Sequence, residues 1–386
     1  MHVSIKYRRV MDIKVYILTF VLALAISFLL MPPFIRLMTK YRILDKSGGR
    51  KIHTGYTAHM GGIVIFIAFA TSVTAMIFAY FKVTGLAQLV SFAVALLVMI
   101  IVGVRDDMND ISPWTKLFFE IIIGVLLGYL GVRVTAITGF SGEVIRIPTL
   151  ISYGATICFF IVVVNAYNLI DGIDGQAGMQ AINTFLFILL FFCFIVGDAR
   201  IPKAPFSPMF ILVCLFAILG SIVGFLRYNW QKAKIFMGDT GSLFIGTLIT
   251  IFIILSMTYA DAINHAEIIP SLQIKAYVAP FLGYFYMPMA DTLRVFISRA
   301  RKNKSPFSAD KTHIHHFFIR LGYSHQRCTL TVFAISFCIS VVSTVLAFFV
   351  SDFVFILIII ASWFVYVKAL NSFIKRQLRR MGGGIS

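Results

Sequence analysis

Apolar runs of roughly 20 residues recur along the whole chain, and each run is long enough for a transmembrane helix. We predict about eleven such spans, at residues 13–37, 61–81, 86–104, 114–131, 149–169, 179–197, 207–226, 241–260, 275–298, 328–350 and 353–370. The mean hydropathy of +0.91 excludes an ordinary soluble domain. The predicted fold is therefore an all-α polytopic membrane protein, in which residues 1–386 form a single integral membrane domain.

The basic residues indicate how the chain is oriented in the membrane. The formal net charge is +18, and most Lys and Arg lie in short loops between the apolar runs. The positive-inside rule explains this distribution better than nucleic-acid binding does, so we expect no nucleic-acid partner. It places the N-terminus outside and the C-terminus in the cytoplasm, although Lys6, Arg8 and Arg9 would then lie outside. The predicted cytoplasmic loops are 38–60, 105–113, 170–178, 227–240 and 299–327, and the outer loop 132–148 has the pattern of a small hairpin.

Acidic residues are rare, with 16 Asp and Glu in 386 residues, yet several Asp gather in the predicted cytoplasmic loops. A carboxylate at the membrane edge is costly unless it holds a metal, a partner or a substrate. Asp106, Asp107 and Asp110 form the first cluster, and Asp106 and Asp110 would share a face if the helix continued through them. Such acids suit a hard cation and its phosphate ligand. A solvated helix end has the same pattern, so this cluster alone leaves both interpretations open.

The second cluster combines two amides and two acids, namely Asn165, Asn168, Asp171 and Asp174. Asn165 and Asn168 are one helical turn apart, and glycines then break the helix and allow backbone to approach a ligand. So many polar groups at a membrane edge are hard to satisfy by packing alone. The spacing lacks the longer ligand ladder of an EF-hand calcium loop. We therefore interpret this cluster as functional.

The third cluster is Gly238-Asp239-Thr240-Gly241-Ser242, which leads directly into a predicted helix. Free backbone N–H groups and the positive end of the helix dipole make such a turn an anion site. Asp239 would oppose an anion by itself, but it fits the site if it holds Mg²⁺ that bridges to a diphosphate. The alternative is an ordinary N-cap formed by Asp239 or Ser242.

The fourth cluster is His313-Ile314-His315-His316, preceded by Asp310. Three histidines can bind zinc, donate to a phosphate when protonated, or have neither role. Neighbouring Lys and Arg residues favour phosphate contact. A weaker basic and glycine-rich stretch is Gly48-Gly49-Arg50-Lys51-Ile52-His53, followed by Gly61-Gly62; it would bind a phosphate or simply follow the positive-inside rule.

Taken in order, these motifs resemble those of the polyprenyl-phosphate N-acetylhexosamine-1-phosphate transferase family. The resemblance extends over about residues 45–320. It rests on Asp106–Asp110 followed by Lys116, on Asn165–Gly175, on Phe236–Ser242, and on Ser305-Pro306-Phe307 with His313–His316. The histidine motif is more similar to the N-acetylglucosamine branch than to the phospho-muramoyl-pentapeptide branch. Departures around His53–His59, Gln176 and Trp230–Ala233 leave the choice of sugar open.

The resemblance implies transfer of a sugar-1-phosphate from a UDP-N-acetyl sugar, with UDP-GlcNAc as first choice, to undecaprenyl phosphate, which releases UMP and starts a cell-envelope polysaccharide. It implies Mg²⁺ as cofactor, with Mn²⁺ as a substitute. The implied metal ligand is Asp239, with Asp107 and Asp171 as further candidates. Implied catalytic residues are Asp106, Asp107, Asp171, Asp174, His313, His315 and His316. Implied substrate-binding residues are Lys46, His53, Asp110, Lys116, Asn165, Asn168, Gly238, Ser242 and Asp310.

By the same resemblance, the site would face the cytoplasm from the inner membrane of a bacterium, and homodimers occur in the family. Asp106 would contact or deprotonate the lipid phosphate. That phosphate has a second pKa near about 6 and is mostly dianionic at neutral pH, so a strong base is not required.

Two other functions remain compatible with parts of the sequence. A transporter would explain intramembrane acids and many spans, but transporter sites lie near the bilayer midplane and these acids lie at the inner ends of the helices. A prenyltransferase with paired Asp-rich motifs would explain Asp106–Asp110 and Asp171–Asp174, but not Asp239 or the histidines. Release of UMP distinguishes the three functions.

Overall fold

The computed structural model describes residues 2–46, 56–80, 86–196, 205–265, 274–303 and 313–380. The helices are α1 His2–Lys40, α2 Gly62–Tyr80, α3 Leu86–Met108, α4 Pro113–Tyr129, α5 Thr149–Ile170, α6 Gln176–Leu190, α7 Pro208–Asn229, α8 Gly238–His265, α9 Ala279–Tyr284, α10 Tyr286–Ala300, α11 Ile314–Arg320, α12 His325–Leu346 and α13 Asp352–Arg380. A short π-helix, η1 Phe191–Val196, continues α6. The strands are β1 Leu44–Lys46, β2 Tyr56–Ala58, β3 Ala136–Thr138 and β4 Val144–Arg146.

Nine helices within these described ranges are long and apolar enough to cross a membrane. With only four short strands beside them, they confirm the predicted all-α polytopic fold. Helix α4 is shorter, at 17 residues, or about 25 Å at the usual rise per residue. Trp114 and Tyr129 are largely exposed near its two ends, and aromatic residues are typical of both membrane interfaces. These features suit the predicted span 114–131.

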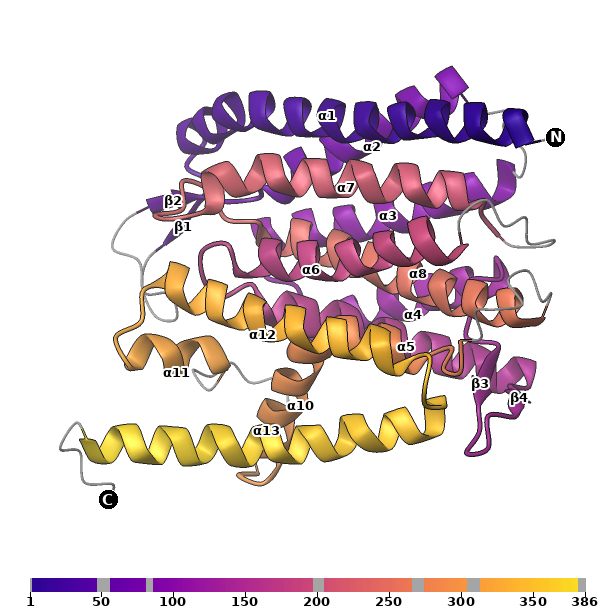
Figure 1. Ribbon diagram of the computed structural model, residues 1–386. Coiled ribbons are helices and arrows are strands. Elements are labelled where there is room, and N and C mark those ends of the chain that lie inside the picture. The colour runs from indigo at the N-terminus through magenta and orange to yellow at the C-terminus, as the bar shows by residue number, and fades with distance from the viewer. Residues whose placement is uncertain are drawn as a thin grey trace.

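The continuous span predicted at 275–298 is wrong, because the structure breaks this segment at Phe285 into α9 and α10. Pro288 has no N–H to donate to the carbonyl of Tyr284, so the regular helical hydrogen bond is missing at this turn. The Tyr284 carbonyl instead accepts hydrogen bonds from Asn183 Nδ2 at 3.2 Å and Thr184 Oγ1 at 3.0 Å. Helix α10 then turns across the bundle, between α5 and α13 (Figure 1).

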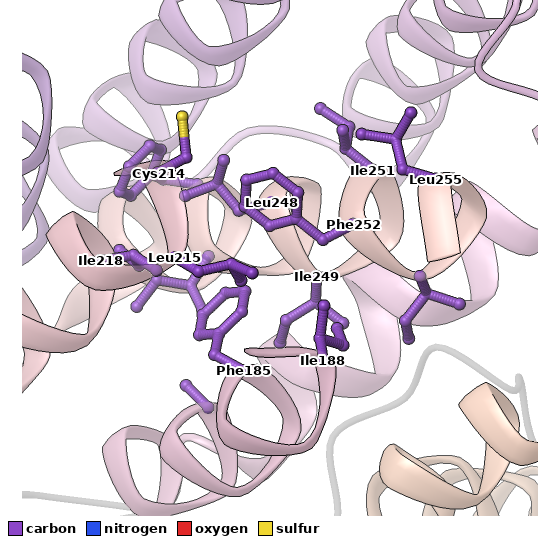
Figure 2. Packing of buried hydrophobic residues seen from close by; sticks show 14 of the residues in the cluster. Phe185, Ile188, Cys214, Leu215, Ile218, Leu248, Ile249, Ile251, Phe252 and Leu255 are labelled. Atoms are coloured by element: carbon purple, nitrogen blue, oxygen red, sulfur yellow. The ribbon is translucent and has the colours of Figure 1, made fainter. Parts of the chain in front are cut away.

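Helix α8 forms the centre of the bundle. Of the 18 residues in its most apolar stretch, 94% are buried in the bundle, against 11% of the corresponding stretch of α13 at the edge. Figure 2 shows Leu248 and Phe252 of α8 among the buried side chains of α6 and α7, which include Phe185 and Leu215. The Thr247 and Thr250 hydroxyls donate to carbonyls four residues earlier, so this core leaves few polar atoms unsatisfied. The outer helices expose large apolar side chains, as a surface in contact with lipid would.

The two ends of the bundle carry different secondary structure. At one end β3 and β4 form an antiparallel hairpin, which confirms the prediction for 132–148. At the opposite end β1 pairs with β2, on the same side as α11 and the last turns of α13 (Figure 1). Helix α1 begins at the hairpin end and α13 finishes at the other end (Figure 1). The two ends of the described chain therefore lie at opposite ends of the bundle.

Close helix crossings bring the start of α8 against α2 and α3. A Cβ on Gly103 would lie 2.5 Å from the Thr240 Cα, and a Cβ on Gly62 would lie 2.1 Å from the backbone N of Gly241. Only glycine therefore permits these contacts. Asp106 and Asp107 follow Gly103 by about one helical turn, so the crossing delivers both carboxylates to the first turn of α8.

Candidate active site

Three charged side chains from three helices meet at the start of α8. The Lys116 Nζ atom, in the first turn of α4, lies 2.6 Å from Asp239 Oδ2 and also contacts Asp106 Oδ2. Asp106 is in the last turn of α3, and Asp239 is in the first turn of α8. The Asp106 carboxylate also accepts the Ile111 N–H at 2.9 Å, which fixes the chain as it leaves α3. A single ammonium thus holds two carboxylates together.

Asp107 has different partners, because it caps the start of α8. Its Oδ1 accepts the Asp239 N–H at 2.7 Å, and its Oδ2 accepts the Thr240 N–H at 3.0 Å and the Thr240 hydroxyl at 2.6 Å. Gly238 has φ +75°, and a Cβ there would lie 2.5 Å from Asp107 Oδ2. The cap considered for Asp239 or Ser242 is therefore supplied from α3. His59 Nδ1 lies 3.5 Å from Asp107 Oδ1.

The two predicted asparagines orient acids on other helices. Asn168 Nδ2 donates to Asp239 Oδ1 at 2.9 Å and to Ser242 Oγ at 2.7 Å. One turn earlier on α5, Asn165 Nδ2 lies 3.0 and 2.8 Å from the two oxygens of Glu120. Glu120 is only 1% exposed and lies one turn beyond Lys116 on α4. The polar cluster therefore continues from Asp239 along α4 and α5.

Asp110 lies beyond the end of α3, which finishes at Met108. Asp106 and Asp110 consequently do not share a helical face, because the Asp106 carboxylate bonds Ile111 N–H and turns the chain toward α4. Asp110 still lines the same cavity as Asp106.

A cavity of about 1530 Å³ begins at these charged residues and continues between apolar helices. Its polar end includes the predicted residues Asp106, Asp107, Asp110, Lys116, Asn165, Asn168 and Asp239. Its apolar walls come from α5, α9, α10 and α13, with Ile161, Leu282, Met289, Leu293, Ile360 and Phe364 among the lining side chains. Trp363 and the buried Arg299 also line it. The cavity therefore combines a cluster of charged side chains with apolar walls.

The turn between α5 and α6 holds Asp171 and Asp174 outside this lining. Asp174 is 4% exposed; its Oδ2 accepts the Ala233 N–H at 3.2 Å, and its backbone carbonyl accepts the Thr329 hydroxyl at 3.0 Å. His325 Nδ1 lies 3.5 Å from Asp174 Oδ1. Asp174 thus ties the turn to α12 and to the loop after α7. Asp171 follows the end of α5, where its N–H donates to the Asn168 carbonyl at 3.3 Å.

The three histidines lie at the start of α11, outside the cavity lining. The His313 and His315 rings are parallel with centroids 5.7 Å apart, and the His315 and His316 centroids are 4.3 Å apart. His315 lies against Gly172, where a Cβ would be 2.4 Å from its Nε2 atom. Burial, together with the neighbouring His316 and His313, lowers the pKa of His315 from 6.5 to about 3. His315 is therefore neutral at physiological pH and cannot by itself supply a cation to a phosphate.

Some predicted residues have no described side chain. Lys46 ends β1 and pairs with Tyr56 of β2 in the antiparallel ladder. His53 and Asp310 lie outside the described residues.

The residues of the polar end fit a divalent cation with phosphate ligands. Asp106 Oδ2 and Asp239 Oδ2 already converge on one cation, the Lys116 ammonium. Mg²⁺ is commonly held by one or two carboxylates, with substrate phosphates and water completing its shell. Across the described ranges, no group of three His, Cys, Asp or Glu side chains is arranged to hold a metal ion. The donor set therefore suits a metal that binds together with a phosphate, and it does not suit a closed zinc site.

Sequence reasoning missed several residues of this region. Glu120 carried one signal, its position four residues after Lys116 in an otherwise apolar run, which puts both on one helical face. Asp291, a buried acid that contacts His313, lay inside a stretch taken as a simple span. His59 and Arg299 fall in the predicted cytoplasmic loops, whose basic character the positive-inside rule already explained.

Comparison with known proteins places the chain among enzymes. Residues 89–257 match the model of glycosyl transferase family 4. The chain is 30% identical over 296 residues to the decaprenyl-phosphate N-acetylglucosaminephosphotransferase of Mycobacterium tuberculosis H37Rv, covering 74% of this chain and 70% of that one. It is 29% identical over 341 residues to a probable undecaprenyl-phosphate N-acetylglucosaminyl 1-phosphate transferase of Bacillus subtilis 168, covering 86% and 84%.

A third relative is the undecaprenyl-phosphate alpha-N-acetylglucosaminyl 1-phosphate transferase of Escherichia coli K12, which is 27% identical over 363 residues, covering 89% and 90%. The residues matched by the family model run through the helices that carry Asp106, Lys116, Asn168 and Asp239. The chain is thus a multi-pass membrane protein of the polyprenyl-phosphate N-acetylhexosamine-1-phosphate transferase family, within glycosyl transferase family 4.

Proposed function

We propose that this protein transfers GlcNAc-1-phosphate from UDP-GlcNAc to a polyprenyl phosphate, with undecaprenyl phosphate as the expected acceptor. An oxygen of the lipid phosphate attacks the sugar-bearing phosphorus of the nucleotide sugar, and the bond from that phosphorus to UMP breaks. The products are polyprenyl-diphosphate-GlcNAc and UMP. The names of the three relatives given above describe this kind of transfer.

The observation that carries the proposal is the shape and polarity of the cavity. Its charged end gathers Asp106, Asp239 and Lys116, and its remaining length is lined by apolar side chains of α5, α10 and α13. A polyprenyl phosphate has this same division, with one charged head and a long hydrocarbon tail. The apolar walls therefore fit the hydrocarbon tail of the lipid acceptor.

The residues at the charged end have distinct proposed roles. Asp239 and Asp106 would hold Mg²⁺, or Mn²⁺ in its place, and the bound metal would neutralise charge on the diphosphate. Lys116 lies between the same carboxylates and is placed to bind a phosphate oxygen. Asn168 fixes Asp239, and Asp107 fixes the helix end that carries it. Phosphoryl transfer needs such positioning and charge neutralisation more than covalent help.

The proposed site faces the cytoplasm, where nucleotide sugars are made, and the proposed membrane is the inner membrane of a bacterium. The basic residues Arg42 and Arg299, from two predicted cytoplasmic loops, line the same cavity as the acids, which supports this orientation. The bacterial origin of the relatives supports the choice of membrane.

Release of UMP from purified protein tests the proposed function. The protein receives undecaprenyl phosphate and Mg²⁺, with UDP-GlcNAc, another UDP-N-acetylhexosamine and UDP-MurNAc-pentapeptide in separate reactions. Of these three donors, we expect only UDP-GlcNAc to give UMP. Release with a different donor only would keep the reaction and replace the sugar. Folded protein that releases UMP from none of these donors would contradict the proposed reaction.

A further inference from the structure

Asp291 is a buried carboxylate that the proposed chemistry does not yet use. It lies on α10 and is 1% exposed. Its Oδ1 accepts from Arg294 Nε at 3.1 Å, Arg294 Nη2 at 2.6 Å and the Tyr366 hydroxyl at 3.2 Å. Its Oδ2 lies 2.9 Å from His313 Nδ1 and accepts the Ile314 N–H at 3.2 Å. Helices α10, α11 and α13 therefore meet at this one carboxylate (Figure 1).

These partners determine which nitrogen of the His313 ring carries the hydrogen. A guanidinium and a backbone amide can only donate, so the carboxylate that faces them is an ionised acceptor. His313 Nδ1 must then carry the hydrogen of the 2.9 Å bond. The Nε2 atom is left as the ring atom that can bind another group.

The pair lies between the cavity and the turn after α5. Ala290 and Thr292, which flank Asp291, line the cavity. On the other side, the His313 ring stacks on His315, whose ring lies against Gly172. His315 Nδ1 is buried and has no hydrogen-bond partner among the described residues. The first turn of α11 is thus wedged between the wall of the cavity and the loop that carries Asp171.

On the basis of the function proposed above, we propose that Asp291 is a positioning residue that acts through His313. It fixes the imidazole ring with its hydrogen on Nδ1, so that the unprotonated Nε2 accepts a hydrogen bond from a hydroxyl of the donor sugar. A carboxylate behind a histidine has this role in other active sites, where it sets both tautomer and orientation. The competing interpretation is that Asp291 only holds α10, α11 and α13 together.

A double-mutant cycle on UMP release separates these interpretations. Asp291→Asn keeps the size of the side chain, and we expect it to lower kcat about 10- to 100-fold with little change in KM for UDP-GlcNAc. His313→Gln keeps a hydrogen-bond acceptor near the Nε2 position but loses the bond to Asp291. If Asp291 acts through His313, the Asp291→Asn/His313→Gln protein has the same kcat as His313→Gln alone. Losses that multiply in the double variant, or an unchanged kcat in Asp291→Asn, would overturn the proposal.

Two further variants control for folding. Tyr366→Phe removes one hydrogen bond from the other carboxylate oxygen, and we expect its kcat within about twofold of the unaltered protein. Asp291→Asn removes the carboxylate that pairs with Arg294, so this variant can fail to fold. Asp291→Asn/Arg294→Gln removes both charges of the pair and is expected to show the same loss of kcat. A loss of kcat of twofold or less in Asp291→Asn/Arg294→Gln would also overturn the proposal. Absence of UMP release from the unaltered protein would instead overturn the transferase function.

Discussion

At the scale of single residues, neighbouring acids in this site have separate partners. Asp239 shares the Lys116 ammonium with Asp106, whereas Asp107 is bonded to the backbone and hydroxyl at the start of α8. A sequence motif of adjacent acids cannot show this division, because it depends on which helix end each carboxylate meets. The same limit explains Asp291, whose importance depends on His313, 22 positions later in the chain.

The shifted pKa of His315 makes stability depend on pH. In the folded protein its pKa is lowered from 6.5 to about 3, mainly by burial. Between these values the unfolded chain binds a proton that the folded one does not, so stability falls as pH decreases below about 6.5. Lowering the pH from about 7.5 to about 5.5 should cost about 1 kcal/mol through this group. The apparent melting temperature in detergent measures this, with His315→Gln as the comparison.

Over this pH range we expect the melting temperature of the unaltered protein to fall further than that of His315→Gln. Equal pH effects in the two proteins would mean that His315 is not held neutral by the fold.

At the scale of helices, the site depends on backbone contact between α3 and α8. Gly103→Ala would place a Cβ 2.5 Å from the Thr240 Cα and push the two helices apart. Displacement of about 1 Å at a reacting group can cost on the order of 100-fold in rate. We therefore expect at least a 10-fold loss of UMP release from Gly103→Ala, together with a lower melting temperature.

Gly154→Ala on α5 is the matched control, since a Cβ there meets no atom within 4 Å. It should keep both activity and stability. Equal activity in the two variants would show that the α3–α8 crossing does not position the carboxylates.

The helices themselves could largely be predicted from apolar run length, because a span must satisfy its backbone hydrogen bonds internally. The break at Phe285 could not, since the apolar pattern of 275–298 continues through Pro288. The carbonyl that Pro288 leaves free is satisfied by Asn183 and Thr184 of α6, about 100 residues earlier in the chain. Only the packed structure shows that such partners are available.

At the scale of the whole molecule, one cavity joins the charged end to the apolar helices. If the lipid tail lies along α13, Ile360→Trp should narrow its path. We expect a several-fold higher KM for undecaprenyl phosphate, a smaller effect on a short-chain prenyl phosphate, and little change in kcat. Leu357→Trp is the matched control on the same helix, because Leu357 is 49% exposed, like Ile360 at 48%, but does not line the cavity. Equal KM values in the two variants would place the tail elsewhere.

The gathering of the acids at one end of the bundle was foreseen from the sequence, because loops at alternate ends of the spans must lie on the same side. The sequence did not show which of these acids would line the cavity. Asp171 and Asp174 share a loop with no other predicted acid, and the turn there directs Asp174 to Ala233 and away from the lining. Local backbone geometry and side-chain direction decide this, and neither follows from spacing alone.

The most direct test of the proposed mechanism compares two acids on helix α8. Asp239 is in the first turn at the charged end, and Asp261 pairs with Arg146 at the hairpin end. We predict that Asp239→Asn lowers Mg²⁺-dependent UMP release by about 100-fold or more, while Asp261→Asn stays within a few-fold of the unaltered protein. Normal Mg²⁺-dependent turnover by folded Asp239→Asn would contradict the assignment of the active site to the cluster of Asp106, Lys116 and Asp239.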